Sequence, residues 1–173
     1  MPINQPSDIN FLSPLGFKFT IAKLPNFEYF IQKFDFPSLS LNRTNDIQTP
    51  FNKIIVAGDH TTWDEFTVTF KIDEDMNSYF EIYDWIVGDG KPESFSQYAN
   101  VAAANSMNRG VMVDADLLIL NGTMNPNIKV TFQDVIPVTL SGFTFDSTED
   151  DVNYITATAS FKYRQYVYQR VVA

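Results

Sequence analysis

The amino-acid sequence predicts a mainly β fold, an antiparallel β-sandwich or barrel with one flanking α-helix. The first observation is a period of two in the apolar residues of several segments, which is typical of strands with one buried and one solvated face. The second is one segment whose apolar residues recur at three- and four-residue spacing, as in an amphipathic helix. The third is composition, because 45% of the 173 residues are apolar and the chain holds 16 Phe, 8 Tyr and 2 Trp. This is enough apolar material for one domain over residues 1–173, and it argues against intrinsic disorder.

The predicted strands follow one another along the chain with turn-forming residues between them. In the clearest of them, polar residues alternate with the apolar residues Ile155, Ala157, Ala159, Phe161 and Tyr163. A long two-faced strand of this kind suits an antiparallel sheet. Pro37 is expected at a strand boundary or edge, because proline cannot donate a hydrogen bond to the ladder. Strands are expected at residues 17–23, 27–36, 38–42, 65–72, 111–121, 128–133, 138–146 and 155–164.

One helix is expected between Asp73 and Gly90. Asp73 or Asp75 can cap its first turn, where the helix dipole favours Glu74. Gly88 and Gly90 are expected to end it. The apolar stripe expected to press onto the sheet consists of Met76, Phe80, Tyr83 and Val87, widened by Tyr79 and Ile86.

Two segments do not fit a compact element. Residues 42–59 carry polar turns around a short apolar run, and residues 88–110 form a long stretch rich in Asn, Ala, Ser and Gly. Connections longer than about 12–15 residues in a compact domain are usually functional or disordered. The apolar side chains of residues 54–56 make little sense on the surface of a monomer, so we expect this hairpin to protrude and to be covered by a partner. We expect the same of a strand edge near the C-terminus, where strict alternation is lost around Tyr166 and Tyr168.

The composition excludes several classes of site. The chain has no cysteine, which excludes a disulfide framework, a thiolate zinc site and a cysteine nucleophile. Its one histidine, His60, has no catalytic motif around it, so we expect no enzyme activity, no metal site and no cofactor. No apolar run approaches the roughly 20 residues of a membrane helix, so no membrane partner is expected. The net charge of -9 argues against a protein that holds nucleic acid by neutralising phosphates.

One block of the sequence, followed by the predicted helix, is distinctive. Residues 55–70 place Ala57-Gly58-Asp59 directly before a strand, and the helix that follows contains Tyr83-Asp84-Trp85. Together with the acidic turn at residues 145–151 and the long final strand, this pattern resembles the tail tube proteins of contractile-tailed, T4-like bacteriophages. A tube-like baseplate protein or a minor tube paralogue is an alternative within the same group.

The resemblance implies a non-catalytic structural subunit that forms homo-oligomeric, hexameric rings. The rings stack into a β-lined channel through which double-stranded DNA is ejected without sticking. The resemblance also implies tail sheath and baseplate proteins as partners, and a place in the virion tail after assembly in the host cytoplasm. The hairpin at residues 42–59 would then reach onto a neighbouring subunit. The subunit-interface residues expected from this hairpin and from the strand edge are Asn45, Phe51, Ile54, Ile55, Val56, Ala57, Gly58, Asp59, Trp63, Tyr166 and Tyr168.

The acidic composition bears on the DNA that would pass through such a channel. Each of the six copies in a ring would carry a net charge of -9. Charges on a narrow wall lie within a few Debye lengths, each about 8 Å, of the duplex, so an acidic wall would repel DNA. Acidity can equally serve solubility alone, and the sequence leaves both interpretations open.

Two other functions fit the sequence. A tube subunit of a contractile injection or secretion system would have a similar fold with a protein cargo. A carbohydrate-binding β-sandwich would use exposed aromatic, Asn and Asp side chains to contact sugars, and it would be a stable monomer.

Overall fold

The computed structural model describes residues 10–41, 47–48, 50–54, 58, 60–90, 96, 112–148 and 153–171. The predicted class, a mainly antiparallel β fold flanked by a helix, is confirmed. The predicted long connection at residues 88–110 lies outside the described residues, apart from the helix end at 88–90 and Ser96. The elements are β1 (Phe17–Ile21), the 3-10 turn η1 (Phe27–Phe30), β2 (Ile31–Asp35), β3 (Leu39–Leu41), β4 (Ile47–Gln48), β5 (Lys53–Ile54), β6 (Thr61–Trp63), β7 (Phe66–Lys71), α1 (Asn77–Gly90), β8 (Val113–Leu120), β9 (Pro126–Leu140), β10 (Thr156–Lys162) and β11 (Gln165–Arg170).

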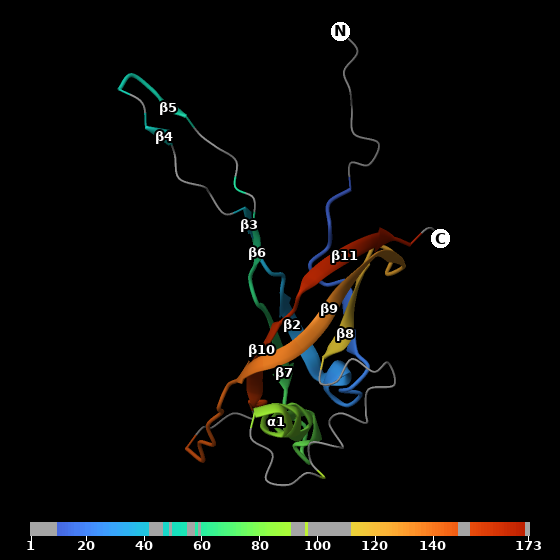
Figure 1. The fold of residues 1–173 in the computed structure, drawn as a ribbon. Coiled ribbons are helices and arrows are strands. Elements are labelled where there is room, and N and C mark those ends of the chain that lie inside the picture. Colours follow the sequence, from blue (N-terminus) through green and yellow to red (C-terminus); the bar gives the residue numbers. More distant parts are fainter. Residues whose placement is uncertain are drawn as a thin grey trace.

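The main sheet is antiparallel throughout and is organised around β9 (Figure 1). Its strand order is β1-β8-β9-β10-β7-β2, and β11 also pairs with β9. The first part of β9 lies between β8 and β11, whereas its last part pairs with β10. Strand β9 therefore belongs to both halves of the sandwich and joins them.

The passage of β9 from one half to the other occurs at Asp134. This residue has a φ of 57°, and the register between β8 and β9 shifts beside it, which is the signature of a β-bulge. The Arg164 Nε atom lies 2.7 Å from Asp134 Oδ2, and the Arg164 backbone N–H donates to the Gln133 carbonyl over 2.9 Å. Residues 163–164 interrupt the strand there, so β10 and β11 follow β9 as two strands.

This arrangement corrects two sequence predictions. Strand β9 is continuous over Pro126–Leu140, where two strands at 128–133 and 138–146 were expected, and residues 141–146 form no strand. The strand expected at 155–164 ends at Lys162. In β9 the bulge at Asp134 changes which face each side chain points to, and alternation read along the sequence does not register that change.

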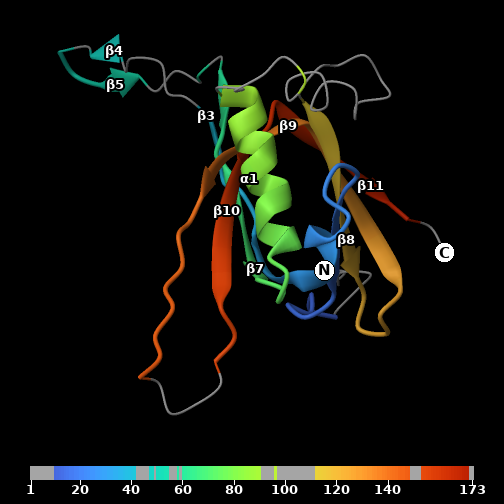
Figure 2. The same cartoon turned by 90° about the horizontal axis from the view of Figure 1, so that it is seen from below.

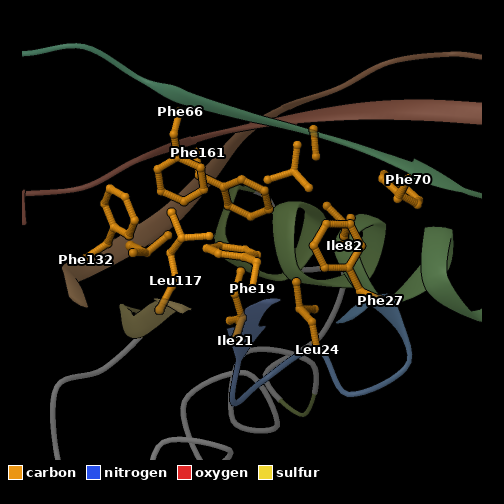
Figure 3. Packing of buried hydrophobic residues seen from close by; sticks show 14 of the residues in the cluster. Phe19, Ile21, Leu24, Phe27, Phe66, Phe70, Ile82, Leu117, Phe132 and Phe161 are labelled. Carbon is orange, nitrogen blue, oxygen red and sulfur yellow. The ribbon is translucent and has the colours of Figure 1, made fainter. Parts of the chain in front are cut away.

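The core is aromatic and lies between the two halves of the sandwich. Figure 3 shows side chains from β1, β7, β8, β9, β10 and α1 converging on it. Phe66 is fully buried at its centre, with ring centroids 5.5 Å from Phe19, 4.8 Å from Phe132 and 5.2 Å from Phe161. Along β7 the buried and half-exposed residues alternate as the sequence predicted.

Helix α1 lies across the fold (Figure 2) and packs against η1 and β9. Its buried residues are Ser78, Ile82, Trp85 and Gly88. The predicted stripe is wrong at Phe80 and Tyr83, which are 48% and 49% exposed, whereas its members Tyr79 and Ile86 pack against the core. Apolar residues occur at helical spacing on two faces of this segment, and the face that carries Trp85 is the one that packs against the core. None of the helices among the described residues is long and apolar enough to cross a bilayer.

Of the two caps that the sequence allowed, Asp73 and Asp75, the structure shows Asp73 capping α1. Its carboxylate accepts hydrogen bonds from the backbone N–H groups of Asn77, over 3.1 Å, and of Ser78, over 2.9 Å. The Ser78 hydroxyl donates to the same carboxylate over 2.5 Å. Desolvation acts to raise the pKa of Asp73, but the hydrogen bonds from Ser78 and Asn77 outweigh it and lower the pKa below its ordinary value.

We expect Asp73→Ala to lower the free energy of unfolding by about 1 kcal/mol at neutral pH, because two N–H groups of the first turn lose their acceptor. A depressed folded-state pKa stabilises the fold above the unfolded-state pKa, and this contribution is lost as the pH falls through the folded-state value. Urea unfolding should therefore separate the variant from the parent at pH 7 but not at pH about 2. Asp75→Ala, at an exposed position, is the matched control. An equal loss in both variants would contradict the capping role.

Candidate subunit interface

A long hairpin extends from the main sheet. Strands β2 and β7 pair within the sheet, β3 and β6 continue the same ladder, and β4 and β5 pair with each other. We refer to the described residues between Leu39 and Trp63 as the arm. Figure 1 shows β4 and β5 at the opposite end of the molecule from α1. At the base of the arm the Asp64 backbone N–H donates to the Ser38 carbonyl over 3.2 Å, and the Ser38 hydroxyl donates to the Asp64 carboxylate.

The arm exposes apolar side chains. Leu39 and Leu41 on β3 are 51% and 56% exposed, and Phe51, between β4 and β5, is 96% exposed. In a monomer these side chains lose the stabilisation that burial supplies, roughly 1.5–3 kcal/mol for a large apolar side chain. The arm therefore has the properties of a surface that a partner covers.

A cluster of aromatic side chains joins the base of the arm to the rest of the domain. The half-buried Trp63 ring lies 4.7 Å from Tyr166 and 6.3 Å from Tyr163, measured between ring centroids. The ring centroid of Phe36, which belongs to the half of the hairpin that carries β2 and β3, lies 5.3 Å from that of Tyr166. Burial, reinforced by Tyr166 and Asp64, raises the pKa of Tyr163 to about 12. This phenol therefore stays neutral at physiological pH, and its oxygen is buried without a hydrogen-bond partner among the described residues.

The structure brings only some of the predicted interface residues together. Trp63 and Tyr166 are in contact, and they join the arm to the body. Phe51 and Tyr168 are exposed, the latter by 71%, and Gly58 is half-exposed. For Ile54 the structure describes the backbone pairing only. The remaining predicted positions lie outside the described residues: Asn45, Ile55, Val56, Ala57 and Asp59.

The sheet ends in open edges. Strands β1 and β2 are the first and last in its order, and no strand in the described part of the chain pairs with their outer edges. Strand β11 pairs with β9 on one side only and exposes Val167 as well as Tyr168. Unpaired N–H and C=O groups along such edges are templates for pairing with another chain.

Sequence reasoning did not identify Leu39, Leu41 and Val167 as surface residues. Leu39 and Leu41 alternate with serine and asparagine, which is the pattern of a half-buried strand. Alternation identifies the apolar face of a strand but not whether the chain itself covers that face. The only signal was position, because both leucines directly precede the polar stretch that begins the predicted protrusion.

The negative charge is concentrated near α1. Residues 73–89 hold six acidic residues and no basic one. The solvated face of β7 and β10, in contrast, is rich in hydroxyl groups, with Thr67 opposite Ser160 and Thr69 opposite Thr158. No group of three or more His, Cys, Asp or Glu side chains within the described ranges could hold a metal ion.

The fold is similar to that of proteins from contractile injection systems. Over 99% of this chain and 100% of the other, it matches a chain in the cryo-EM structure of the anti-feeding prophage cap, the tube-terminating cap, with a TM-score of 0.66 and 12% identity. It matches a chain in the extended sheath-tube complex of the extracellular contractile injection system PVC with a TM-score of 0.59 and 13% identity, over 93% of each chain. It matches Hcp1 of E. coli EAEC 042 with a TM-score of 0.52 and 9% identity, over 90% of this chain and 92% of Hcp1.

No protein-family model matches the sequence, and no curated protein matches it. The likeness is therefore one of fold, and it extends over almost the whole chain. The chain has the fold found in tube and tube-cap proteins of contractile injection systems, as the resemblance to contractile-tail tube proteins predicted.

Proposed function

We propose that this protein is a structural subunit of a phage tail tube, in which hexameric rings stack into a channel for double-stranded DNA. The observation that carries the proposal is an open-edged sheet in a fold shared, over almost its full length, with a tube-terminating cap. The tail sheath and the baseplate would be its partners in the virion, after assembly in the host cytoplasm. The role is mechanical, and it needs no catalytic group and no cofactor.

The open edges give this assembly a physical basis. An unpaired edge strand adds a strand from a neighbour through main-chain hydrogen bonds, and this pairing is specific in register. Pairing β1, β2 or β11 with an edge of the next copy would continue the sheet around a ring. The exposed leucines of β3 and the exposed Tyr168 of β11 would supply apolar contact area. A stable contact needs roughly 800 Å² from each partner.

The net negative charge of the chain is suited to a channel through which DNA must pass without binding to the wall. DNA is held by lysine and arginine side chains that displace its counterions. This chain has 12 basic residues against 21 acidic ones. Tube walls built from it would therefore hold DNA weakly.

A tube of a contractile injection system is the second candidate, because the similar structures come from such systems. Its rings and stacking would be the same, and its cargo would be protein. The two functions differ in the native particle. A DNA-filled capsid attached to the tail would support the phage function, and a capsid-free particle loaded with protein would support the second.

The purified full chain tests the assembly directly. We expect negative-stain electron microscopy to show six-fold rings with an axial hole, and stacks of these rings at higher concentration. We expect light scattering to give a ring mass six times that of the 19.7 kDa subunit. A mass of one subunit at every concentration, with no rings on the grid, would contradict the proposal.

A further inference from the structure

An apolar pocket lies at the end of the molecule opposite the arm tip. It has a volume of about 510 Å³ and opens between the residues that precede α1 and those that flank β9 and β10. Figure 1 places α1 and the arm tip at opposite ends. The pocket is lined mainly by the apolar residues Phe30, Ile72, Met76, Phe143, Phe145 and Tyr154.

The lining of the pocket is unusually exposed for aromatic side chains. Phe145 and Tyr154 are 76% and 73% exposed. The Phe145 ring lies 5.3 Å from Phe143, and the Lys71 ammonium lies 4.1 Å above the Tyr154 ring, measured to the centroid. Contacts between these side chains define the pocket, yet much of their apolar surface remains in water. A concave apolar surface lined by exposed aromatic side chains is suited to contact with an apolar side chain of a partner.

The same chain exposes an aromatic side chain at the tip of the arm. Phe51, at the arm tip, is 96% exposed, so its ring contacts little of its own subunit. It lies between the two paired strands β4 and β5, which hold it at the turn of the hairpin. An aromatic side chain presented on a hairpin buries a large area at a small cost in conformational entropy, which is typical of interface anchors.

The charges around the two surfaces are complementary. Asp73, Glu74 and one cation, Lys71, line the pocket, and Asp75 follows Glu74 in the chain, so the net charge around the pocket is negative. The arm tip, residues 47–54, carries Lys53 and no acidic residue. A positively charged arm tip is attracted to the net negative charge around the pocket, whereas two pockets brought face to face would repel each other.

The tip and the pocket lie at opposite ends of the molecule, so Phe51 can reach this pocket only on a second copy of the chain. Because the two surfaces lie at opposite ends, their contact is head-to-tail, and such a contact repeats from copy to copy instead of closing after two. We propose that Phe51 of one subunit inserts into the pocket lined by Phe145 and Tyr154 of a subunit in the next ring. This inference rests on the proposed tube function and assigns the contact that stacks the rings.

The absence of cysteine makes a direct proximity test possible. Phe51→Cys combined with Phe145→Cys gives a chain with two thiols at the proposed contact. We expect a short bismaleimide added to assembled tubes to link successive subunits into a ladder on a denaturing gel. Phe51→Cys combined with Asn127→Cys, which is exposed at the start of β9, should give no ladder. A ladder from the control pair, or none from the Phe51–Phe145 pair in intact tubes, would overturn the contact.

Alanine variants test the energetic role of the contact. Phe51→Ala and Phe145→Ala should each leave the thermal unfolding and the ring mass unchanged, because both side chains are exposed in the subunit. We expect each to lower the fraction of protein that sediments as tubes by about tenfold or more. Phe11→Ala, at a side chain that is 99% exposed, is the matched control and should form tubes normally. Normal tubes from both pocket-contact variants, or loss of the rings themselves, would reject the inference.

The outcomes separate this inference from the proposed function. A parent protein that forms neither rings nor tubes would overturn both. A parent protein that forms tubes without the Phe51–Phe145 link would overturn the pocket contact alone.

Discussion

Phe66→Ala should lower the free energy of unfolding by about 3–5 kcal/mol. Phe66 is fully buried, and its ring packs against Phe34 at 5.3 Å and Tyr163 at 5.7 Å as well as against the core rings described above. Truncation removes the contacts that join β1, β2, β7, β9 and β10 and leaves a cavity among rigid rings. Domains are commonly stable by about 5–15 kcal/mol, so this single change removes a large share of the total.

Urea or thermal unfolding followed by circular dichroism measures this loss. Phe145→Ala is the matched control, because it removes the same side chain from an exposed position and should change stability by less than about 0.5 kcal/mol. A loss at Phe66 no larger than the loss at Phe145 would mean that the aromatic core is not what holds the two halves of the sandwich together.

Deletion of residues 45–55 should leave a folded subunit that forms no rings. The deletion leaves every buried core residue in place, and it shortens the hairpin beyond the β3–β6 ladder and the Trp63–Tyr166 contact. Unfolding of the variant should therefore match that of the parent. The deletion also removes Ile54 and Ile55, which the resemblance to tail tube proteins assigns to the contact with a neighbouring subunit, and so it goes further than Phe51→Ala, which removes the stacking contact alone.

Light scattering and negative-stain microscopy of the deletion variant provide the measurement. A variant in which residues 45–55 are replaced by Gly and Ser at the same length is the control for chain length, and it should also remain a monomer. Hexamers of normal mass from either variant would show that the arm is not required for ring formation.

Much of the fold is predictable because the core is built from alternating strands. Phe66, Val68 and Phe70 alternate with threonines in the sequence, and the structure buries the first three and half-exposes the threonines between them. A carboxylate cap before α1 is predictable because Asp is a preferred residue at helix N-termini, but the sequence does not choose between Asp73 and Asp75.

The sequence does not predict features for which two different arrangements give the same spacing of apolar residues. In α1, Phe80 and Tyr83 satisfy helical spacing as well as Ile82 and Trp85 do, and only packing in three dimensions selects between them. In β9, Asp134 adopts a left-handed backbone conformation that no local motif announces. The pocket has the same origin, because Phe143 and Phe145 fall in a segment where alternation predicts a strand, and the structure turns that segment outward.

The continuity of the arm with the sheet has a mechanical consequence. Strands β2 and β7 lead into β3 and β6, so a pull on the tip is transmitted along the backbone into the middle of the domain. Because the pull acts parallel to these strands, it loads the hydrogen bonds between β7 and its neighbours in shear, and they resist together instead of opening one after another. A subunit that a neighbour holds by its arm is therefore expected to resist tension along the direction in which the arm extends.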